Sequence, residues 1–297
     1  MRPNERTGLA IILSLIALVL FDGMGLIIKH LSDRYSAVEL SAWRNLFGLI
    51  PSIIALWSAK AWHDGGKRLK IRQWKLGLLR GVVVTFAQLC FYMSLGLMAF
   101  ATASTITYAS ALFTTALAIP LFGERVGWVR WGAVLIGFFG VVMVVQPGTD
   151  RFSIYALLPL AASAFYALVS VTARLFDDEV PSPLVNLYSS FTAAIGAFVL
   201  AYFWAGFTPI ASATDLGWII AMGGFGGTAV LFLIVSYRMT EQSNLAPFSY
   251  FGIPIAFVLG WLLFDEAPWG TLFPGAILIA AGGLLIVWRE KTRSKKG

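Results

Sequence analysis

Charged residues are scarce in this sequence, and their scarcity decides its class. Only 12% of the 297 residues are Asp, Glu, Lys or Arg, whereas 58% are hydrophobic. A soluble domain carries about 25% charged residues, so a chain of this composition is expected to lie in a lipid bilayer. The longest polar stretch is the loop 59–75, which is too short to form a soluble domain of its own.

Cysteine and histidine are almost absent, which excludes several kinds of site. Cys90 is the single cysteine, so neither a disulfide framework nor a cysteine-based metal site is expected. The two histidines, His30 and His63, belong to no His-Glu-x-x-His sequence of the kind that zinc hydrolases use. Asp22 is the one acid deep within an apolar run, so an aspartyl dyad lacks its second member. We predict no metal, no cofactor and no catalytic residue.

Long apolar runs fill most of the chain. A hydrocarbon core about 30 Å thick needs about 20 apolar residues in a helix. The first run follows a basic start that resembles a signal peptide, but it has spanning length and no small-residue cleavage site, so we expect a retained helix. Ten spanning helices are predicted, at 9–31, 37–58, 74–96, 100–122, 128–146, 153–175, 183–205, 214–236, 243–264 and 269–288.

Positive charge is distributed unevenly over the connections. Most of the 22 Lys and Arg residues lie at the two termini and in the loops after the even-numbered runs, whereas Lys29, Arg34 and Arg151 are alone on the opposite side. The positive-inside rule then places both termini in the cytoplasm, and we expect a multi-pass protein of the cell inner membrane. The net charge of +7 is explained by this topology and by contact with anionic lipid, so no nucleic-acid partner is expected.

Two segments of the sequence resemble each other without a gap. "YASALFTTALAIPLFGERVGW" begins at Tyr108 and "YFGIPIAFVLGWLLFDEAPWG" begins at Tyr250. Residues 1–147 and 148–297 are therefore predicted to be two copies of a five-helix unit. Because five is odd, the second copy enters the membrane from the opposite side. Such inverted repeats, packed around a central cavity, are typical of secondary transporters.

Three segments carry a family resemblance. "PLFGERVGWVRWGAVLIGFFGVVMV" at 120–144 and "LLFDEAPWGTLFPGAILIAAGGLLIV" at 262–287 each place an acid before a Gly-rich helix, and "IKHLSDRYSAVELSAWRNLF" at 28–47 places an Arg early in helix 2. Nearly the whole chain resembles the drug/metabolite transporter superfamily, EamA type, and within it the bacterial amino-acid exporters of the YddG kind. The resemblance implies a ten-helix carrier whose cavity is lined by helices 1, 3, 4, 6, 8 and 9.

Polar side chains recur at helical spacing on the helices that the resemblance places around the cavity. Their hydroxyls have an alternative role, since Ser and Thr in spanning helices often bond their own or a neighbouring helix. The predicted substrate-binding residues are Asp22, Gln88, Tyr92, Tyr108, Tyr166, Ser170 and Tyr250. The residues predicted to gate or to form ion pairs are Lys29, Arg44 and Arg174.

Asp22 needs a reason to lie within an apolar helix, because an ionised side chain there costs at least a few kcal/mol. At 1.5 Å per residue, Asp22 and Arg44 reach the same depth on adjacent helices, so we predict that they pair. Lys29 lies further along, where it can extend to the outer mouth. The pair is either a structural lock or a charged element of the cavity that faces an amino-acid substrate or carries a coupling proton.

The expected activity is transport, without an enzymatic step. We predict a secondary transporter that exports small metabolites, most of all amino acids with aromatic or hydrophobic side chains, by alternating access. The alternative is a carrier of another metabolite or drug class, nucleotide-derived or cationic. An intramembrane enzyme and a channel are more remote alternatives, because the sequence has no catalytic set and no filter-like segment. The expected partners are a small-molecule substrate, lipid and a coupling proton, in a monomer or a homodimer.

Overall fold

The described part of the chain is helical. The computed structural model describes residues 3–59, 62–63, 66, 69–122, 128–146, 153–172, 175–177, 180–239, 248, 250–266 and 268–294, and these contain no strand. The first half forms α1 (Pro3–Leu31), α2 (Ala37–Ser58), α4 (Trp74–Leu97), α5 (Phe100–Thr107), α6 (Ser110–Phe122) and α7 (Trp128–Val145). The second half forms η1 (Ile154–Ala156), α8 (Leu157–Thr172), α9 (Ser182–Leu200), η3 (Ala201–Ala205), α10 (Ala213–Met239), α12 (Gly252–Phe264), α13 (Trp269–Leu272) and α14 (Gly275–Ser294).

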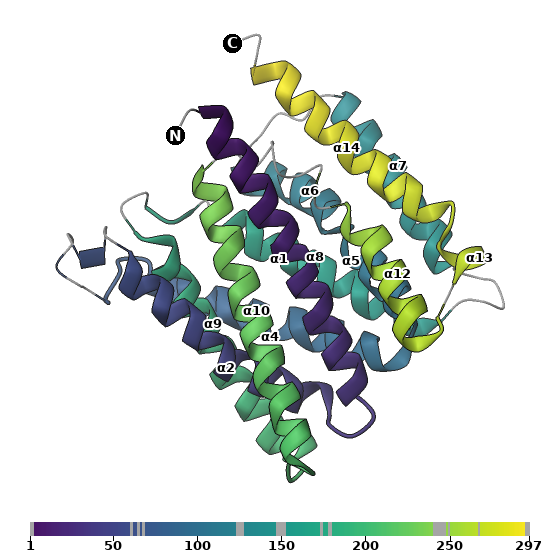
Figure 1. Cartoon of the computed structure of the whole chain (residues 1–297). Coiled ribbons are helices and arrows are strands. Elements are labelled where there is room, and N and C mark those ends of the chain that lie inside the picture. Colours follow the sequence, from purple (N-terminus) through teal and green to yellow (C-terminus); the bar gives the residue numbers. More distant parts are fainter. Residues whose placement is uncertain are drawn as a thin grey trace.

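The helices have the length and hydropathy of membrane spans. Within the described residues, 6 helices are long and apolar enough to cross a bilayer: Gly8–Leu31, Ala37–Ser58, Trp74–Leu97, Ile154–Thr172, Pro183–Ala205 and Ala213–Leu233. Shorter apolar helices cover Trp131–Val145, Gly252–Phe264 and Gly275–Leu285. The regular structure of the described residues is therefore entirely helical, and the protein is a multi-pass membrane protein. The start of α1 and the end of α14 lie at the same end of the helix bundle (Figure 1).

Two predicted helices are broken in the structure. The run 269–288 forms α13 and α14, with Phe273 and Pro274 between them. The run 100–122 was expected to be continuous, but it forms α5 and α6, with Tyr108 and Ala109 between them. The amide of Tyr108 is shared between the carbonyls of Ser104 and Thr105, as is common where a helix tightens at its end. In the other half α12 begins two residues after Tyr250 and, like α6, has 13 residues.

The turn between α1 and α2 is fixed by local capping. The Ser36 hydroxyl accepts the Glu39 amide, and the Glu39 carboxylate accepts the Ser36 amide at 2.8 Å. This reciprocal pair is the capping box that satisfies the first free N–H groups of a helix. Glu39 is also buried, and it accepts a hydrogen bond from the amide of Thr208 in the segment before α10.

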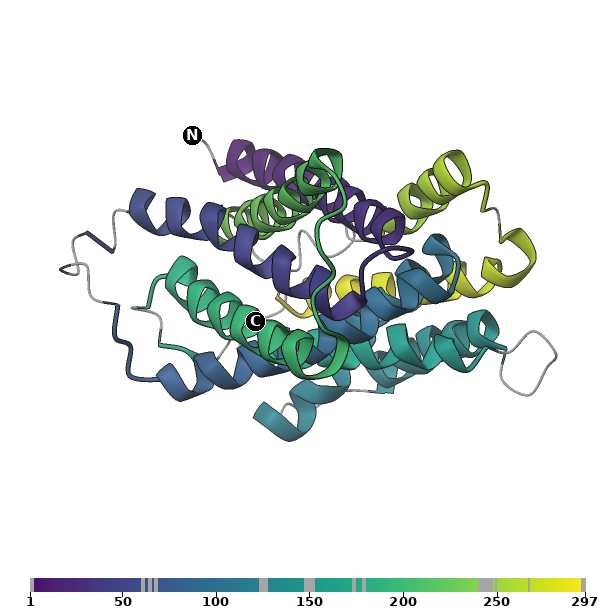
Figure 2. The ribbon, with the colours of Figure 1, turned by 90° about the horizontal axis from the view of Figure 1, so that it is seen from below.

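Helices from the two halves of the chain pack in pairs. α1 lies along α10 and α4 along α8, while α2 packs on α9, α5 on α12 and α7 on α14. Figure 1 shows α7 and α14 side by side, and Figure 2 shows α12 and α13 on the opposite side of the bundle from α2. The two halves of the chain are therefore interleaved in space, although each is continuous in sequence.

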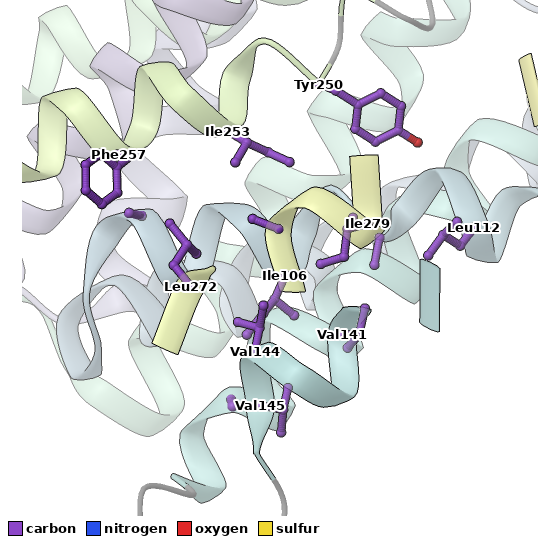
Figure 3. Close-up of a cluster of buried hydrophobic side chains, with 14 of the residues drawn as sticks. Ile106, Leu112, Val141, Val144, Val145, Tyr250, Ile253, Phe257, Leu272 and Ile279 are labelled. Atoms are coloured by element: carbon purple, nitrogen blue, oxygen red, sulfur yellow. The ribbon is translucent and has the colours of Figure 1, made fainter. Parts of the chain in front are cut away.

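Glycines bring α7 and α14 into close contact. A Cβ atom at Gly140 would lie 2.7 Å from the carbonyl oxygen of Gly275, and one at Gly282 would lie 2.7 Å from that of Ala133. Small residues that let backbones approach are typical of helix contacts in membranes. Beside this contact lies a cluster of buried hydrophobic side chains from α5, α6, α7, α12 and α14, shown in Figure 3.

Candidate functional site

Asp22 is a buried acid without an ionic partner. Its side chain lies on α1 with 5% of its surface exposed, and its Oδ2 atom has no hydrogen-bond partner. The ion pairs found among the described residues join Lys29 to Glu266 and Arg34 to Asp215. The predicted pair between Asp22 and Arg44 is therefore wrong for this structure.

The direction of the side chains around α1 explains this difference. Arg44 is 7% exposed, and its Nε atom lies 3.5 Å from the sulfur of Met24. Asp22 and Met24 are two residues apart, so their side chains point about 200° apart around the helix axis. The pair was predicted from equal depth along the membrane, and depth alone does not state in which direction around α1 each side chain points. Arg44 lies where α1, α2 and α10 meet, since Gly226 of α10 also abuts its guanidinium.

A buried network of neutral amides holds Arg44 in place. The NH1 group of Arg44 donates to Oδ1 of Asn45 at 3.0 Å. The side-chain amide of Asn45 donates in turn to Oε1 of Gln88 at 2.6 Å and to the carbonyl of Ser41 at 2.9 Å. Gln88, predicted to bind substrate, returns a hydrogen bond to Asn45. The amide of Gln88 is thus engaged by α2, and its role in the structure is to orient Asn45 and, through it, Arg44.

Three of the predicted tyrosines lie near Asp22 or Arg44. Tyr108, at the break between α5 and α6, is within electrostatic range of Asp22. Tyr92 of α4 and Tyr166 of α8 are within electrostatic range of Arg44. Tyr108 and Tyr166 keep part of their surface accessible although they lie deep in the interior. The hydroxyl of Tyr92 is buried and has no hydrogen-bond partner.

The structure separates the other predicted residues from this group. Tyr250 belongs to the hydrophobic cluster beside α14, where its hydroxyl abuts Gly283, and Figure 3 shows that hydroxyl pointing away from Phe257. We predicted that Tyr250 would face the cavity together with Tyr108, and its packing against α14 argues against that. Ser170 is exposed, and Arg174 lies outside the described residues.

Lys29 joins helices from both halves at the end of the bundle away from the termini. Its Nζ atom lies 2.9 Å from Oε1 of Glu266 and donates to the carbonyls of Leu95 at 3.2 Å and Met98 at 2.9 Å. The other oxygen of Glu266 accepts the amide of Phe100 at 2.9 Å. Glu266 therefore caps the start of α5. Lys29 was expected at an open mouth, but its side chain is largely buried.

A second polar cluster at the same end was missed by the sequence reasoning. Arg34 donates to Asp215 at 2.8 Å, and the hydroxyl of Tyr35 donates to the same carboxylate at 2.9 Å. The amide of Ala211 donates to the Tyr35 hydroxyl. Asp215 is 1% exposed, and its position in the first turn of α10 is the one signal in the sequence that could have marked it. This cluster ties the α1–α2 turn to α10.

Known proteins agree with a transport role for this arrangement. Residues 8–146 match the EamA-like transporter family. An S-adenosylmethionine uptake transporter of Rickettsia felis is 26% identical over 278 residues, which cover 93% of this chain and 92% of that protein. A pseudopaline exporter of Pseudomonas aeruginosa is 24% identical over 97% of both chains.

Further relatives extend the range of transported compounds. A riboflavin transporter of Rhizobium johnstonii is 33% identical over 196 residues, which cover 65% of this chain and 64% of that protein. A solved crystal structure with 19% identity superposes with a TM-score of 0.65 and covers 95% of this chain and 98% of its own, which supports the fold alone. The relatives that this chain resembles are thus transporters of small compounds. The narrower prediction of a YddG-like amino-acid exporter is not supported by these relatives.

Proposed function

We propose that this EamA-like chain is a secondary carrier that moves a small metabolite across the bacterial inner membrane by alternating access. We place its substrate site in the interior, near Asp22 with Tyr108 and near Arg44 with Tyr92 and Tyr166. These residues come from α1, α2, α4, α8 and the break between α5 and α6. A discontinuous helix beside a central site is typical of secondary transporters.

The observation that carries this proposal is the symmetry of the helix packing. We propose two inverted copies, residues 1–147 and 148–297, in which α1, α2, α4, α5–α6 and α7 correspond in order to α8, α9, α10, α12 and α13–α14. Exchanging each helix for its counterpart turns the α1–α10 pair into α8–α4, and it turns α2–α9, α5–α12 and α7–α14 into themselves. All of these pairs occur in the structure.

The glycine contacts between α7 and α14 obey the same exchange. Gly140 abuts Gly275, and their aligned counterparts, Gly282 and Ala133, abut each other. A pseudo-two-fold axis between two copies produces such reciprocal contacts. Two copies that exchange conformations convert a cavity open on one side into a cavity open on the other, which is the physical basis of alternating access.

The relatives suggest the first substrates to test. Two of them are named for S-adenosylmethionine and riboflavin, compounds that both contain a flat heterocycle, and tyrosine rings suit such a group by stacking. Free amino acids and the direction of export stay predictions, and the relatives include both an uptake protein and an exporter. A carrier runs in either direction according to the gradients of its substrate and of any coupling ion.

Exchange in proteoliposomes tests the proposal. Vesicles that contain the purified protein are loaded with S-adenosylmethionine, riboflavin or methionine, and uptake of the same labelled compound is measured with and without a pH gradient. We expect saturable exchange of one of these compounds and its loss in Tyr108→Ala. Tyr155→Ala, which changes an exposed tyrosine, is the matched control and should keep the exchange. Absence of exchange for all three compounds would overturn the proposed function.

A further inference from the structure

The side chain of Tyr108 ends against Gly252, the first residue of α12. A Cβ atom at position 252 would overlap the Tyr108 hydroxyl oxygen and would lie 3.1 Å from the ring carbon Cε1. The three heavy atoms nearest to this Cβ position all belong to the Tyr108 side chain. Tyr108 starts at the break between α5 and α6, so its ring crosses from that break to the backbone of α12.

Neither backbone conformation nor helix packing explains a glycine at position 252. Among the described residues, the glycines with a positive φ are Gly66 and Gly206, so the backbone of Gly252 is open to any L-residue. Where glycines bring two helices together, as at Gly140, a Cβ atom would meet the backbone of the other helix. At Gly252 it would meet one side chain. The missing Cβ atom therefore makes room for Tyr108, and we call this place the seat of Tyr108.

Only one copy of the repeat contains this seat. In the gapless alignment Tyr108 corresponds to Tyr250, and Gly252 corresponds to Ser110. Exchange of the two copies would bring Tyr250 to Ser110, whose Cβ atom fills the place that Gly252 leaves open. Tyr250 lies elsewhere, with its hydroxyl against Gly283. The two aligned tyrosines thus have different seats, and the glycine at position 252 serves Tyr108 alone.

The surroundings of the two tyrosines differ as well. α1 packs on both α5 and α12, and Asp22 of α1 lies within electrostatic range of Tyr108. Tyr108 packs against the edge of the hydrophobic cluster and keeps part of its surface accessible. Tyr250 is a member of that cluster with 7% of its surface exposed (Figure 3). A shift of Tyr108 therefore changes the interior near Asp22, whereas a shift of Tyr250 changes a packed core.

We propose that Gly252 is a positioning residue of this carrier, which holds the Tyr108 side chain near Asp22 in the geometry that binds substrate. This inference rests on the proposed function, which places Tyr108 in the substrate site. Binding groups must be held within about 0.5 Å of their productive geometry. Since non-bonded heavy atoms keep a separation of about 3.5 Å, an added Cβ atom pushes the Tyr108 hydroxyl away by roughly 2 Å.

Gly252→Ala tests the seat by adding one methyl group. Binding of S-adenosylmethionine, riboflavin and methionine is measured in detergent, and exchange of the same three compounds is measured in proteoliposomes. We expect Gly252→Ala to weaken binding of the compound that wild-type protein exchanges by about tenfold or more, the size of a moderate overpacking effect.

Gly283→Ala is the matched control, because it creates the same conflict with the other tyrosine. A Cβ atom at position 283 would overlap the hydroxyl oxygen of Tyr250, so both variants should lose thermal stability. Gly283→Ala should nevertheless bind substrate within about twofold of wild-type protein, because its effect is confined to a separate contact. A purely structural role of Gly252 predicts instead that the two variants have the same affinity.

Shortening Tyr108 removes the conflict. A leucine lacks Cε1, Cζ and the hydroxyl oxygen, which are the atoms that approach Gly252, so adding Gly252→Ala to Tyr108→Leu should cost no thermal stability. If Gly252→Ala does not fold by itself, Tyr108→Phe is the background for the affinity comparison. It lacks the overlapping oxygen but keeps Cζ and Cε1, so adding Gly252→Ala to it should still weaken binding.

The outcomes separate this inference from the proposed function. If wild-type protein exchanges one of the compounds and Gly252→Ala binds it with unchanged affinity, Gly252 is not a positioning residue and the carrier stays intact. An equal loss of affinity in Gly252→Ala and Gly283→Ala would also overturn the inference. If wild-type protein neither binds nor exchanges any of the three compounds, the proposed function fails and the inference fails with it.

Discussion

The ion pair between Lys29 and Glu266 gives the sharpest prediction about conformational change. It joins α1 to the segment after α12 at the end of the bundle away from the termini, and Glu266 also accepts the first amide of α5, that of Phe100. Opening the bundle at this end must separate these helices. We therefore predict that neutralising either partner increases opening there, and that the amides of α5 report the change.

The magnitude follows from the burial of the pair. The side chains of Lys29 and Glu266 are 12% and 27% exposed, so the pair lies between exposed pairs, which contribute 0.2–1 kcal/mol, and buried pairs, whose disruption costs 3–5 kcal/mol. Lys29 keeps its two carbonyl acceptors, Leu95 and Met98, when Glu266 is changed. We expect Glu266→Gln to favour opening by about 1–2 kcal/mol, which is a factor of roughly 5 to 30 in the equilibrium.

Hydrogen exchange of the α5 amides measures this factor. When closing is faster than exchange, the exchange rate is proportional to the open population, so Glu266→Gln and Lys29→Gln should each accelerate the first turn of α5 by about 5- to 30-fold. Asp265→Asn is the matched control, since Asp265 is an exposed neighbouring acid. The double variant should be no faster than the faster single variant, because both remove one interaction. Unchanged exchange in both single variants would refute the role of the pair as a closure.

Three other predictions test the site, the helix packing and the topology. Asp22→Asn should leave the thermal stability in detergent unchanged within about 1 kcal/mol, because Asp22 has no ionic partner to lose, and should lower exchange at least tenfold; a large loss of stability would restore the paired interpretation. Gly140→Leu should destabilise the protein by about 3 kcal/mol, whereas Gly132→Leu, with no atom within 4 Å of its Cβ position, should not; equal effects would contradict the α7–α14 contact. Single cysteines at Asp33 and Ser58 should label from opposite sides of the membrane, the second from the cytoplasm, and labelling from one side would disprove the orientation.

The long helices could be predicted from the sequence because their signal is local. The predicted run 37–58 has the bounds of α2, and 74–96 ends one residue before α4 does. The break at Tyr108 could not be predicted from hydropathy, because the residues on both sides of it are apolar and each side forms a helix. At the break α5 packs on α12, and this contact joins residues that are far apart in sequence.

The site was less predictable because it depends on direction around each helix axis as well as on depth. The depth of a residue in the membrane follows from counting residues along its helix, and this count predicted that Asp22 and Arg44 lie at the same level. Direction depends on how α1 rotates against α2 and α10, which the sequence does not state, and it separates the two charges. The partner of Lys29 was missed for a related reason, because Glu266 is near the other end of the chain and no local pattern connects them.

The two polar clusters at the end away from the termini differ in what their release would require. Arg34 and Asp215 connect the α1–α2 turn to α10, and α1 and α10 are packed along their lengths, so this pair stays within one tightly packed unit. Lys29 and Glu266 connect α1 to the segment after α12, and α1 touches α12 over a much smaller surface. A bundle opens first where the fewest contacts are lost. We therefore expect the interface that contains the Lys29–Glu266 pair to separate first during transport. Lys29 lies two helical turns from Asp22 on the same stripe of α1.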